Sequence, residues 1–427
     1  MALFNLTKDN KFYHGIKKED YLKIQPTSGT SANKNQSGDI LFEIAQSSSI
    51  LDICNSLIYF SIEIKDSEET ITLENNFFPR LFSEMTLKLG GTEIERIKYP
   101  GEISTMLNLV LLNENFKNTC GDMMTWIPDN MNENNENIGE KKRKNIYKSK
   151  LFEGFFPLRY LFGFLQCYGR VVYLLSIDLI LNRKMHNDKE IFYGTTTKNW
   201  TEIKMNLQIK DLEFWIPQLK LNPDIEIDII KQIKNTEEIN VTFLKRLTAN
   251  LNTNNESIFV WTPFTCANKI RFLFIGFKNE ENKYSENNAL FIQSKEMEFK
   301  DPVDITKKIK KVKRITNIQV QVKDVYYPVN PLEFDITKNK EVLPYSYYIN
   351  VCNLFSNSTQ LNILDWQNLY SIFCFDLTAQ ENEIVNQYPI TIHVKKDPEF
   401  KPVIYVVALE EKLNKINIID GKMANVI

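Results

Sequence analysis

Histidine is the first residue type in this chain that could support catalysis or bind a metal ion. The chain has only three histidines, His14, His186 and His393. They lie far apart, and none has the spacing of a zinc-binding His-Glu-x-x-His pair. His393 falls on the polar face of a predicted strand, where an ordinary surface side chain explains it. We therefore predict no metal site.

The cysteines are scattered in the same way. They lie at Cys54, Cys120, Cys167, Cys266, Cys352 and Cys374, with no Cys-x-x-Cys pair among them. Three of the six fall within apolar stretches. This context favours buried free thiols over disulfides or zinc ligands.

The sequence also lacks the short motifs that bind phosphate or activate a serine. It contains no Walker loop, no Gly-x-Gly-x-x-Gly and no Gly-x-Ser-x-Gly. Only 14 of the 427 residues are glycine, and backbone that cradles a phosphate usually needs glycine. Carboxylates are spread evenly, so no pair stands out as an acid and a base. We predict no catalytic residue, no cofactor-binding residue, no cofactor and no enzyme activity.

Length and charge set the broad class of the protein. A chain of 427 residues exceeds one ordinary hydrophobic core and predicts two domains. A net charge of −2 and a pI near 6.1 exclude a globally basic nucleic-acid binder. The N-terminus lacks the basic start and apolar core of a signal peptide, and no apolar run reaches the ~18 residues of a membrane span. We expect a soluble protein made inside the cell, without a membrane span.

One alternating segment lies where a chain of this length should divide. Apolar residues occupy every second position from Ile203 to Ile209 and again from Leu212 to Ile216, which is typical of a strand with one buried face. The phase shifts at Lys210-Asp211, which predicts a β-bulge inside one long strand. We accordingly divide the chain into an N-terminal arm (1–37), a first domain (38–217) and a second domain (218–427).

The first domain has the pattern of strands joined by short helices. Gly90-Gly91 separates two alternating segments, which is a strong hairpin signal because a tight turn needs positive φ. The aromatic run 155–164 is predicted to anchor the core. We interpret the polar segment 118–148 as a long solvated loop, and its basic run 141–144 as solvent-facing. Other strands are predicted at 40–44, 58–64, 85–89, 92–97 and 171–181, and helices near 76–84 and 102–115.

The second domain repeats this pattern. The apolar run 270–277 is predicted to lie deep in a sandwich. Segment 225–229 fits a strand or the start of a helix that runs to Ile233, and a basic run covers 307–314. Further strands are predicted at 258–261, 318–322, 370–376, 390–394 and 403–409, with a helix near 345–355. With roughly eight strands in each half, we predict an all-β fold of two tandem eight-stranded antiparallel jelly rolls, with short helices in long loops.

The hairpin and its flanks resemble one protein family. Leu81-Phe82 and the segment 87–96, followed by Gly101 and Ser104-Thr105-Met106, are similar to the double jelly-roll major capsid proteins of Polinton-type elements and adintoviruses, including their copies in invertebrate genomes. These relatives often have Asn-Gly at the turn where this chain has Gly90-Gly91. Further matches follow in order between residues 38 and 420: 157–164, 179–183, Trp215-Ile216-Pro217, 260–262, 270–277, Tyr326-Tyr327-Pro328 and 345–350.

The resemblance implies a structural protein of the virion. It implies a homotrimer that forms a pseudo-hexagonal capsomer of an icosahedral shell, and it brings no active-site residues. The implied partners are neighbouring capsomers, penton proteins and minor capsid proteins, with weak contact of the arm or the basic loops to packaged DNA. A different class stays open, namely a jelly-roll binding module such as a receptor- or carbohydrate-binding viral protein. An enzyme on this scaffold would need a metal or carboxylate site that the sequence does not reveal.

Overall fold

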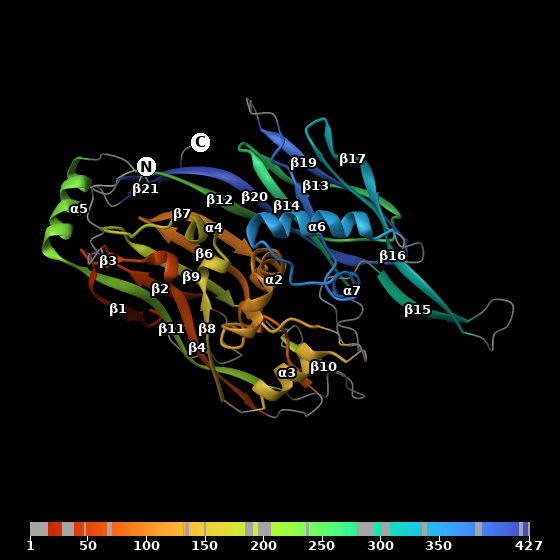
Figure 1. Cartoon of the computed structure of the whole chain (residues 1–427), viewed down its shortest axis with the longest axis horizontal. Coiled ribbons are helices and arrows are strands. Elements are labelled where there is room, and N and C mark those ends of the chain that lie inside the picture. Colours follow the sequence, from red (N-terminus) through yellow and green to blue (C-terminus); the bar gives the residue numbers. More distant parts are fainter. Residues whose placement is uncertain are drawn as a thin grey trace, which may run out of the picture.

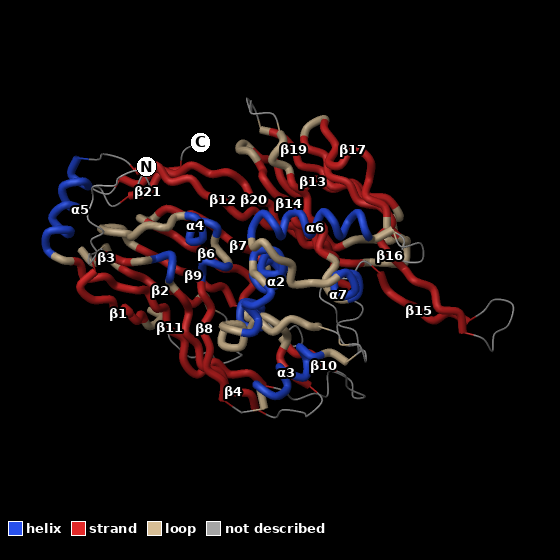
Figure 2. The backbone as a smooth tube through the Cα atoms, viewed as in Figure 1, coloured by secondary structure: helices blue, strands red, loops and turns tan. Residues whose placement is uncertain are grey.

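Antiparallel strands are the main secondary structure in the computed structural model of this chain (Figures 1 and 2). The structure describes residues 16–27, 38–46, 48–65, 71–130, 132, 136–148, 151–183, 191–194, 206–235, 239–279, 294–300, 308–334, 340–380, 387–417 and 422–425. His14 and His186 therefore lie outside the described residues.

Eight main strands form the first roll. They are β1 (Ile16–Ile24), β2 (Ile40–Ile44), β4 (Leu57–Lys65), β6 (Phe82–Leu89), β7 (Thr92–Lys98), β8 (Leu151–Pro157), β9 (Ile177–Arg183) and β11 (Asn206–Leu221). Sheet A has the strand order β1-β11-β4-β8, and sheet B has the order β2-β9-β6-β7. Short β3 (Ile50–Leu51) pairs with β11, and β5 (Ile71–Leu73) pairs with β10 (Phe192–Gly194).

Eight more main strands form the second roll. They are β12 (Ile239–Asn252), β13 (Ile258–Cys266), β14 (Ile270–Asn279), β16 (Lys308–Val322), β17 (Val325–Glu333), β18 (Ile372–Asp376), β19 (Tyr388–Lys396) and β20 (Pro402–Asn417). Sheet A′ has the order β12-β20-β14-β18, and sheet B′ joins β13, β19 and β16, with β17 paired to β16. β15 (Ser294–Lys300) also pairs with β16, and β21 (Lys422–Asn425) pairs with β20.

The two rolls share one topology. When the main strands of each roll are numbered along the chain, sheets A and A′ both have the order 1-8-3-6, and sheets B and B′ both have the order 2-7-4-5. The chain thus passes back and forth between two sheets in each half, as a jelly roll requires. The predicted fold of two tandem eight-stranded jelly rolls is confirmed.

The helices occupy the connections between strands. The predicted helices near 76–84, 102–115 and 345–355 are present with shifted ends, because β6 already begins at Phe82 and because Pro100 and Val342 start their helices earlier. The ambiguous segment 225–233 is helical. The helices are α1 (Phe77–Arg80), α2 (Pro100–Leu111), α3 (Ile138–Ile146), α4 (Gly163–Cys167), α5 (Pro223–Asn235), α6 (Val342–Phe355) and α7 (Ile363–Asn368), with single turns at Ile53–Asn55, Glu114–Asn118 and Leu158–Tyr160.

Strand β11 confirms the predicted bulge. Its register against β4 changes between Ile209 and Asp211, which is the predicted position. The strand continues to Leu221, and α5 then leads into the second roll. Ile203 and Met205, which belonged to the predicted strand, lie outside the described residues.

The prediction that residues 1–37 form an arm outside the sheets is wrong for Ile16–Ile24. This segment is β1, the first strand of sheet A, and it pairs along β11 with Tyr21 opposite Pro217. The first six of its nine residues are all exposed, so the strand shows no apolar alternation. Only Leu22 and Ile24 pack against the core. Residues 1–15 and 28–37 lie outside the described part.

The prediction of a solvated loop over 118–148 is also wrong. Trp126 and Arg143 are fully buried, and the basic run lies on α3. The helix begins where the Asn137 side chain accepts the backbone N–H of Glu140, a cap hidden in the sequence by the surrounding Asn/Glu tract. Each basic residue pairs with a carboxylate: Lys141 with Glu136, Lys142 with Asp122, Arg143 with Asp129 and Lys144 with Glu140. The second basic run, 307–314, lies mainly in β16, and its side chains lie outside the described part of the structure.

The core confirms the predicted burial of the aromatic run and of β14, and the predicted burial of the cysteines in part. Phe156, Phe162 and Phe164 of the aromatic run are buried, as is the apolar stretch of β14. All six cysteines are free, as predicted, but their predicted burial holds only for Cys266, Cys352 and Cys374. Cys54 is half-buried, and Cys120 and Cys167 are exposed. Burial raises the pKa of the Cys266 and Cys352 thiols to about 12, so these thiols stay protonated and inert.

The hairpin between β6 and β7 is built as its sequence predicts. Gly90 and Gly91 have φ of 54° and 76°, values that residues with a Cβ rarely adopt. The Gly90 N–H donates to the carbonyl of Ser176 at 2.9 Å, which ties the turn to the segment before β9. The turn is therefore held by the pairing of β6 with β7 and by this hydrogen bond to Ser176.

Replacing Gly90 and Gly91 together by valine should lower stability by roughly 1 to 3 kcal/mol per strained residue, because a β-branched side chain is strained at positive φ. Denaturant melts of the variant and the parent measure the change. Gly38→Val is the matched control, because Gly38 is exposed and has no atom within 4 Å of an added Cβ. An unchanged midpoint for the double variant would contradict the tight turn.

Candidate assembly site at the roll junction

The candidate site in the described part of the chain is the junction between the two rolls, where several charged side chains are buried. Among the described residues, no three His, Cys, Asp or Glu side chains lie close enough to hold a metal ion. His393 makes a 2.9 Å hydrogen bond to Gln321, and burial lowers its pKa. No helix in the described part of the chain is long and apolar enough to cross a membrane. The buried charges lie elsewhere, mainly where the two rolls meet.

Strand β7, the edge of sheet B, meets β12, the edge of sheet A′. The Glu95 carboxylate on β7 is fully buried and accepts two backbone N–H groups, that of Phe164 at 2.7 Å and that of Arg246 at 2.8 Å. A third bond runs from the Lys98 N–H to the Thr248 hydroxyl at 3.2 Å. An edge strand has backbone donors and acceptors without partners in its own sheet. Here, side chains of each edge strand accept backbone N–H groups of the other edge strand.

Helix α4 fills the space beside this contact. Phe164 packs edge-to-face on Phe243 of β12, with the ring centroids 5.3 Å apart. The Arg246 side chain donates to Gln166 at 2.8 Å. A Cβ on Gly163 would lie 1.9 Å from the carbonyl oxygen of Leu244, so only glycine fits there.

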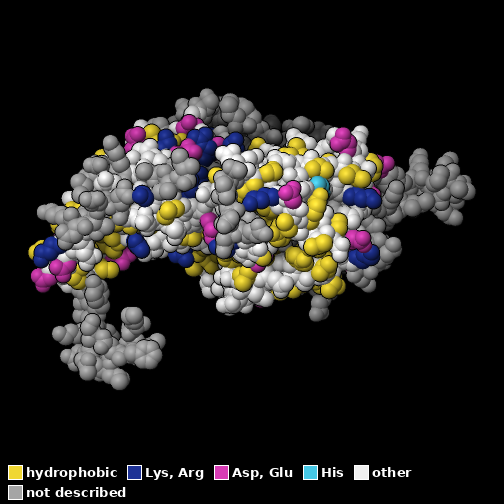
Figure 3. All heavy atoms as spheres, turned by 90° about the horizontal axis from the view of Figure 1, so that it is seen from above, with side chains coloured by type: hydrophobic (Ala, Val, Ile, Leu, Met, Phe, Trp, Pro, Cys, Tyr) yellow, Lys and Arg dark blue, Asp and Glu magenta, His cyan; other side chains and the backbone are white. Residues whose placement is uncertain are grey.

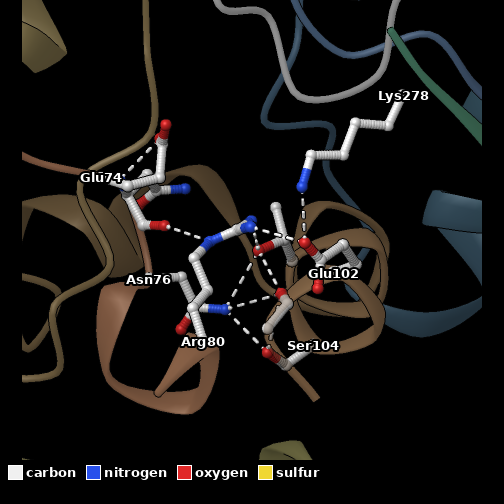
Figure 4. Close-up of polar contacts among 9 residues, drawn as sticks. Glu74, Asn76, Arg80, Glu102, Ser104 and Lys278 are labelled. Carbon is white, nitrogen blue, oxygen red and sulfur yellow. Dashed lines mark hydrogen bonds and ion pairs between the residues drawn. The ribbon is translucent and has the colours of Figure 1, made fainter. Parts of the chain in front are cut away.

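Helix α2 carries a second buried group of charges (Figure 4). Arg80 of α1 donates to Glu102 at 2.9 Å, and Lys278 of β14 reaches the same carboxylate oxygen at 2.8 Å. The Arg80 and Glu102 side chains are only 1% and 2% exposed. Glu102 therefore joins a cation of the first roll to a cation of the second. A buried carboxylate with two cationic donors is compensated, whereas removing either cation would leave charge in the interior.

The motif residues of the family resemblance surround this group. Asn76 donates to the Ser104 hydroxyl at 2.7 Å and to the Thr105 hydroxyl at 3.1 Å. Gly101 lies against Arg80, where an added Cβ would meet the arginine Cγ at 2.3 Å. The motif is thus explained by packing of α1 on α2. The family resemblance includes these residues but does not predict that they pack α1 on α2.

The second roll also binds the C-terminal end of α2. Gln360 donates to the carbonyls of Asn108 and Leu112 at 2.7 Å each, and Tyr348 of α6 donates to the carbonyl of Leu109 at 2.8 Å. The last carbonyls of a helix have no partner within the helix, so these bonds satisfy groups that burial would otherwise leave unpaired. Trp126 completes the set by donating to Gln360 at 3.2 Å.

A third buried cluster lies next to α3. Arg143 donates to Asp129 at 2.7 Å and to the carbonyl of Ile127 at 2.6 Å. Tyr370 of the second roll accepts the N–H of Asp129 at 2.9 Å. Burial raises the pKa of nearby Glu74, and the positive charge of Arg143 opposes that rise. No sequence pattern predicts this cluster, because a buried arginine inside a Lys/Arg run resembles a solvent-facing one.

Burial also controls the protonation of Glu95. It raises the pKa of this carboxyl from 4.5 to about 6, and the charge of Arg246 and the two backbone donors limit the rise. Burial lowers the pKa of Arg246 to about 10. For both groups, the cost of losing hydration exceeds the gain from their mutual attraction, although each remains mostly charged at neutral pH.

Large hydrophobic side chains are also exposed, in two main places. On the second roll they lie on β13, β17 and α6: Ile258, Val260, Val325, Tyr326, Val329, Val342, Leu343 and Leu354. Figure 3 shows hydrophobic side chains gathered around the histidine on one face. On the first roll they lie on sheet A, at Ile16, Tyr21 and Leu151. Apolar patches on a folded surface mark sites of association.

Fold and site together define a double jelly-roll protein whose two rolls meet at a junction of buried charges. The chain belongs to the double jelly roll-like domain family, whose model matches residues 71–404.

Solved structures with a similar fold come from two viruses and a virophage. A chain of the PBCV-1 virus capsid aligns with a TM-score of 0.63 at 8% identity, covering 99% of both chains. A chain of the Sputnik virophage aligns with a TM-score of 0.66 at 11% identity, covering 100% of this chain and 92% of that one. The Faustovirus major capsid protein gives 0.55 at 10% identity, covering 96% and 92%. No curated protein matches the chain in sequence.

Replacing Gly163 by alanine should destabilise the junction by about 1 to 3 kcal/mol, because the added methyl group meets backbone that cannot move aside cheaply. Thermal melts and limited proteolysis between the rolls measure the effect. Gly38→Ala, at an open position, is the control. A Gly163→Ala protein as stable and as protease-resistant as the parent would rule out the close approach to Leu244.

The raised pKa of Glu95 predicts a pH-dependent stability. The folded state binds the Glu95 carboxyl proton more tightly than the unfolded chain does. The contribution of this carboxyl to the free energy of unfolding is therefore greatest below pH 4.5 and is lost as the pH rises through about 6. From pH 5 to pH 7 the loss should be roughly 1 kcal/mol.

The measurement is a set of denaturant melts at several pH values for the parent and for Glu95→Gln. The glutamine cannot ionise, and it also turns an N–H₂ toward one backbone donor, so the variant should be weaker throughout but less sensitive to pH. Titration of other groups is common to both proteins. Parallel pH curves would show that Glu95 does not titrate in this range.

Proposed function

We propose that this chain is the major capsid protein of a virus of the Polinton-type or adintovirus kind. Three copies form a pseudo-hexagonal capsomer, and capsomers tile an icosahedral shell. The chain acts through assembly, and we assign it no enzyme activity, catalytic residue or cofactor.

The observation that carries this proposal is the repetition of one strand order in two rolls that are joined by a buried polar junction. Such a chain holds two similar blocks at a fixed relative position. Three copies then supply six similar blocks, which pack in a near-hexagonal net while each chain folds only once. The solved structures of similar fold include a PBCV-1 virus capsid and a Faustovirus major capsid protein, which supports the proposal.

We place the border between the two rolls at α5, and keep residues 38–217 and 218–427 as the approximate extents, with β1 added to the first roll. Neighbouring capsomers, penton proteins and minor capsid proteins are the proposed partners, and the virion is the proposed location. Because α3 engages its basic residues in ion pairs, any DNA contact would fall to residues 1–15 or 307–314, which have no described side chains.

Light scattering of the purified chain tests the proposal. We expect a particle with three times the 50.1 kDa mass of the chain, stable at micromolar concentration, because obligate interfaces of this kind bury about 2,000 Å² or more. Negative-stain microscopy should show pseudo-hexagonal particles. A monomer across ordinary salt concentrations would contradict a capsid subunit and favour the binding-module alternative.

A further inference from the structure

We propose that helix α5 is a docking site for residues 1–15 of the same chain. The docked segment covers an apolar strip on the helix and balances the acidic side chains beside it. It thereby straps the connection between the two rolls. The contact lies within one chain, so it does not depend on the self-assembly proposed above.

Helix α5 joins the last strand of the first roll, β11, to the first strand of the second, β12, and none of its described side chains is buried. Ile225, Ile229 and Ile230 are half-buried, and Ile227 is 50% exposed. Because residues three apart are neighbours on a helix, Ile227 and Ile230 share one face. We call these two residues the apolar strip of α5. A surface helix usually turns its apolar residues toward the core, so the exposed strip is suited to a partner.

Acidic side chains flank the apolar strip. Asp224, Glu226 and Asp228 lie within the first two turns of α5. Asp228 pairs with Lys231 at 3.8 Å. Within the part of the chain that the structure describes, no cationic side chain forms an ion pair with Asp224 or Glu226. A partner that fits this surface therefore combines apolar side chains with positive charge.

The start of β1 determines where residues 1–15 join the sheet. Ile16 lies opposite Leu221, and α5 begins just beyond it at Pro223. The register shifts between Ile16 and Lys18, and such a bulge bends a strand. Ile16 is itself 52% exposed. The chain that precedes β1 therefore joins it beside the first turn of α5, and Figure 1 shows both elements at the same end of the molecule.

The helix and the segment match in length. α5 has 13 residues and is about 20 Å long, whereas fifteen extended residues span up to about 50 Å. Ile227 lies four positions after Pro223, about 6 Å along the helix axis. Phe12 lies four positions before Ile16, and four extended residues span about 13 Å. Phe12 and its neighbour Tyr13 can therefore reach the apolar strip.

Residues 1–15 also have the required composition. Lys8 and Lys11 outnumber the single carboxylate, Asp9. The large apolar side chains after Met1 are Leu3, Phe4, Leu6, Phe12 and Tyr13. The segment therefore offers apolar and positively charged side chains together.

Seating Phe12 on Ile227 brings the lysines to the acidic side chains of α5. Lys11 is adjacent to Phe12 in the chain, and Lys8 lies four positions before it. Both lysines then lie near the first turn of the helix, where the unpaired carboxylates are. Docking engages these lysines, so any DNA contact of this chain would fall to the basic run 307–314.

The same chain is favoured over other occupants of the strip. The pairing of Ile16 with Leu221 keeps the preceding residues close to α5, and so short a tether gives an effective concentration on the order of mM. A segment from a second copy lacks this advantage. A lipid surface is disfavoured, because anionic headgroups repel the acidic side chains of α5.

Disulfide cross-linking in the full chain tests the contact. Phe12→Cys and Ile227→Cys are combined in a protein whose accessible cysteines are replaced by serine, at Cys54, Cys120 and Cys167. We expect mild oxidation to join positions 12 and 227 in most molecules, as read from peptide masses after proteolysis. Phe12→Cys with Leu354→Cys is the matched control, because Leu354 is 62% exposed on α6, far from α5 (Figure 1).

The outcomes of this experiment separate the possible occupants. Equal cross-linking of the two pairs in folded protein, or no cross-link at position 227, would overturn the docking. Oxidation of a mixture of isotope-labelled and unlabelled chains identifies the source, and cross-links between the two kinds of chain would assign the segment to a second copy instead. Co-sedimentation of the parent with vesicles of phosphatidylcholine and phosphatidylserine, abolished by Ile227→Asp, would assign the strip to lipid and also overturn the proposal.

Charge reversal tests the ionic part of the contact. Lys8→Glu/Lys11→Glu should speed hydrogen exchange of the α5 amides about two- to fivefold, as expected for the loss of exposed ion pairs. In a protein that already carries Asp224→Lys/Glu226→Lys, the same two glutamates should slow the exchange. This change of sign does not depend on what the acidic residues contribute to the helix itself.

Lys395→Glu/Lys401→Glu is the control for net charge, because both lysines are exposed on the second roll. It should leave exchange in α5 unchanged in either background. An effect of Lys8→Glu/Lys11→Glu that has the same sign in both backgrounds, or that the control reproduces, would contradict the pairing of these lysines with α5.

Discussion

The burial of Glu95 is the interaction on which the arrangement of the two rolls depends. Taking a carboxylate out of water is costly, and the structure offsets the cost with two backbone donors that come from different rolls. Neither roll alone could bury this group without leaving it partly unpaired. The same logic applies to Glu102, whose two cations also come from different rolls. The junction therefore fixes one relative position of the rolls, because a small shift would expose or orphan several charges together.

Much of the fold followed from short-range rules. Alternation, the Gly-Gly turn and the bulge at Lys210-Asp211 are local, and they depend on backbone geometry that the neighbouring residues determine. β1 escaped prediction because its outward residues are polar or charged and only Leu22 and Ile24 reach the core. Arg143 escaped because its burial depends on Asp129 and on packing beside the second roll, which no local pattern encodes. The site was thus harder to predict than the sheets, since its members come from both halves of the chain.

Identical topology does not produce identical surfaces in the two rolls. Both use the fifth strand and the helix after it as a projecting element, yet α2 is packed and polar at its contacts whereas α6 carries exposed leucine and valine. The first element meets its partner during folding of one chain, where the partner is always present. The helix of the second element, α6, packs on α2 and β18 along one face and leaves Val342, Leu343 and Leu354 exposed.

The pairing of β1 with β11 also constrains how the chain can be made. Ile16 lies opposite Leu221, so the first strand of sheet A has no sheet neighbour until most of the first half has left the ribosome. The second roll has the same order, with Ile239 opposite Ile416 near the end of the chain. Contacts of such long sequence separation form slowly, because the loop must close before they contribute. During synthesis, the apolar faces of β4 and β14 must therefore wait for strands that are not yet translated.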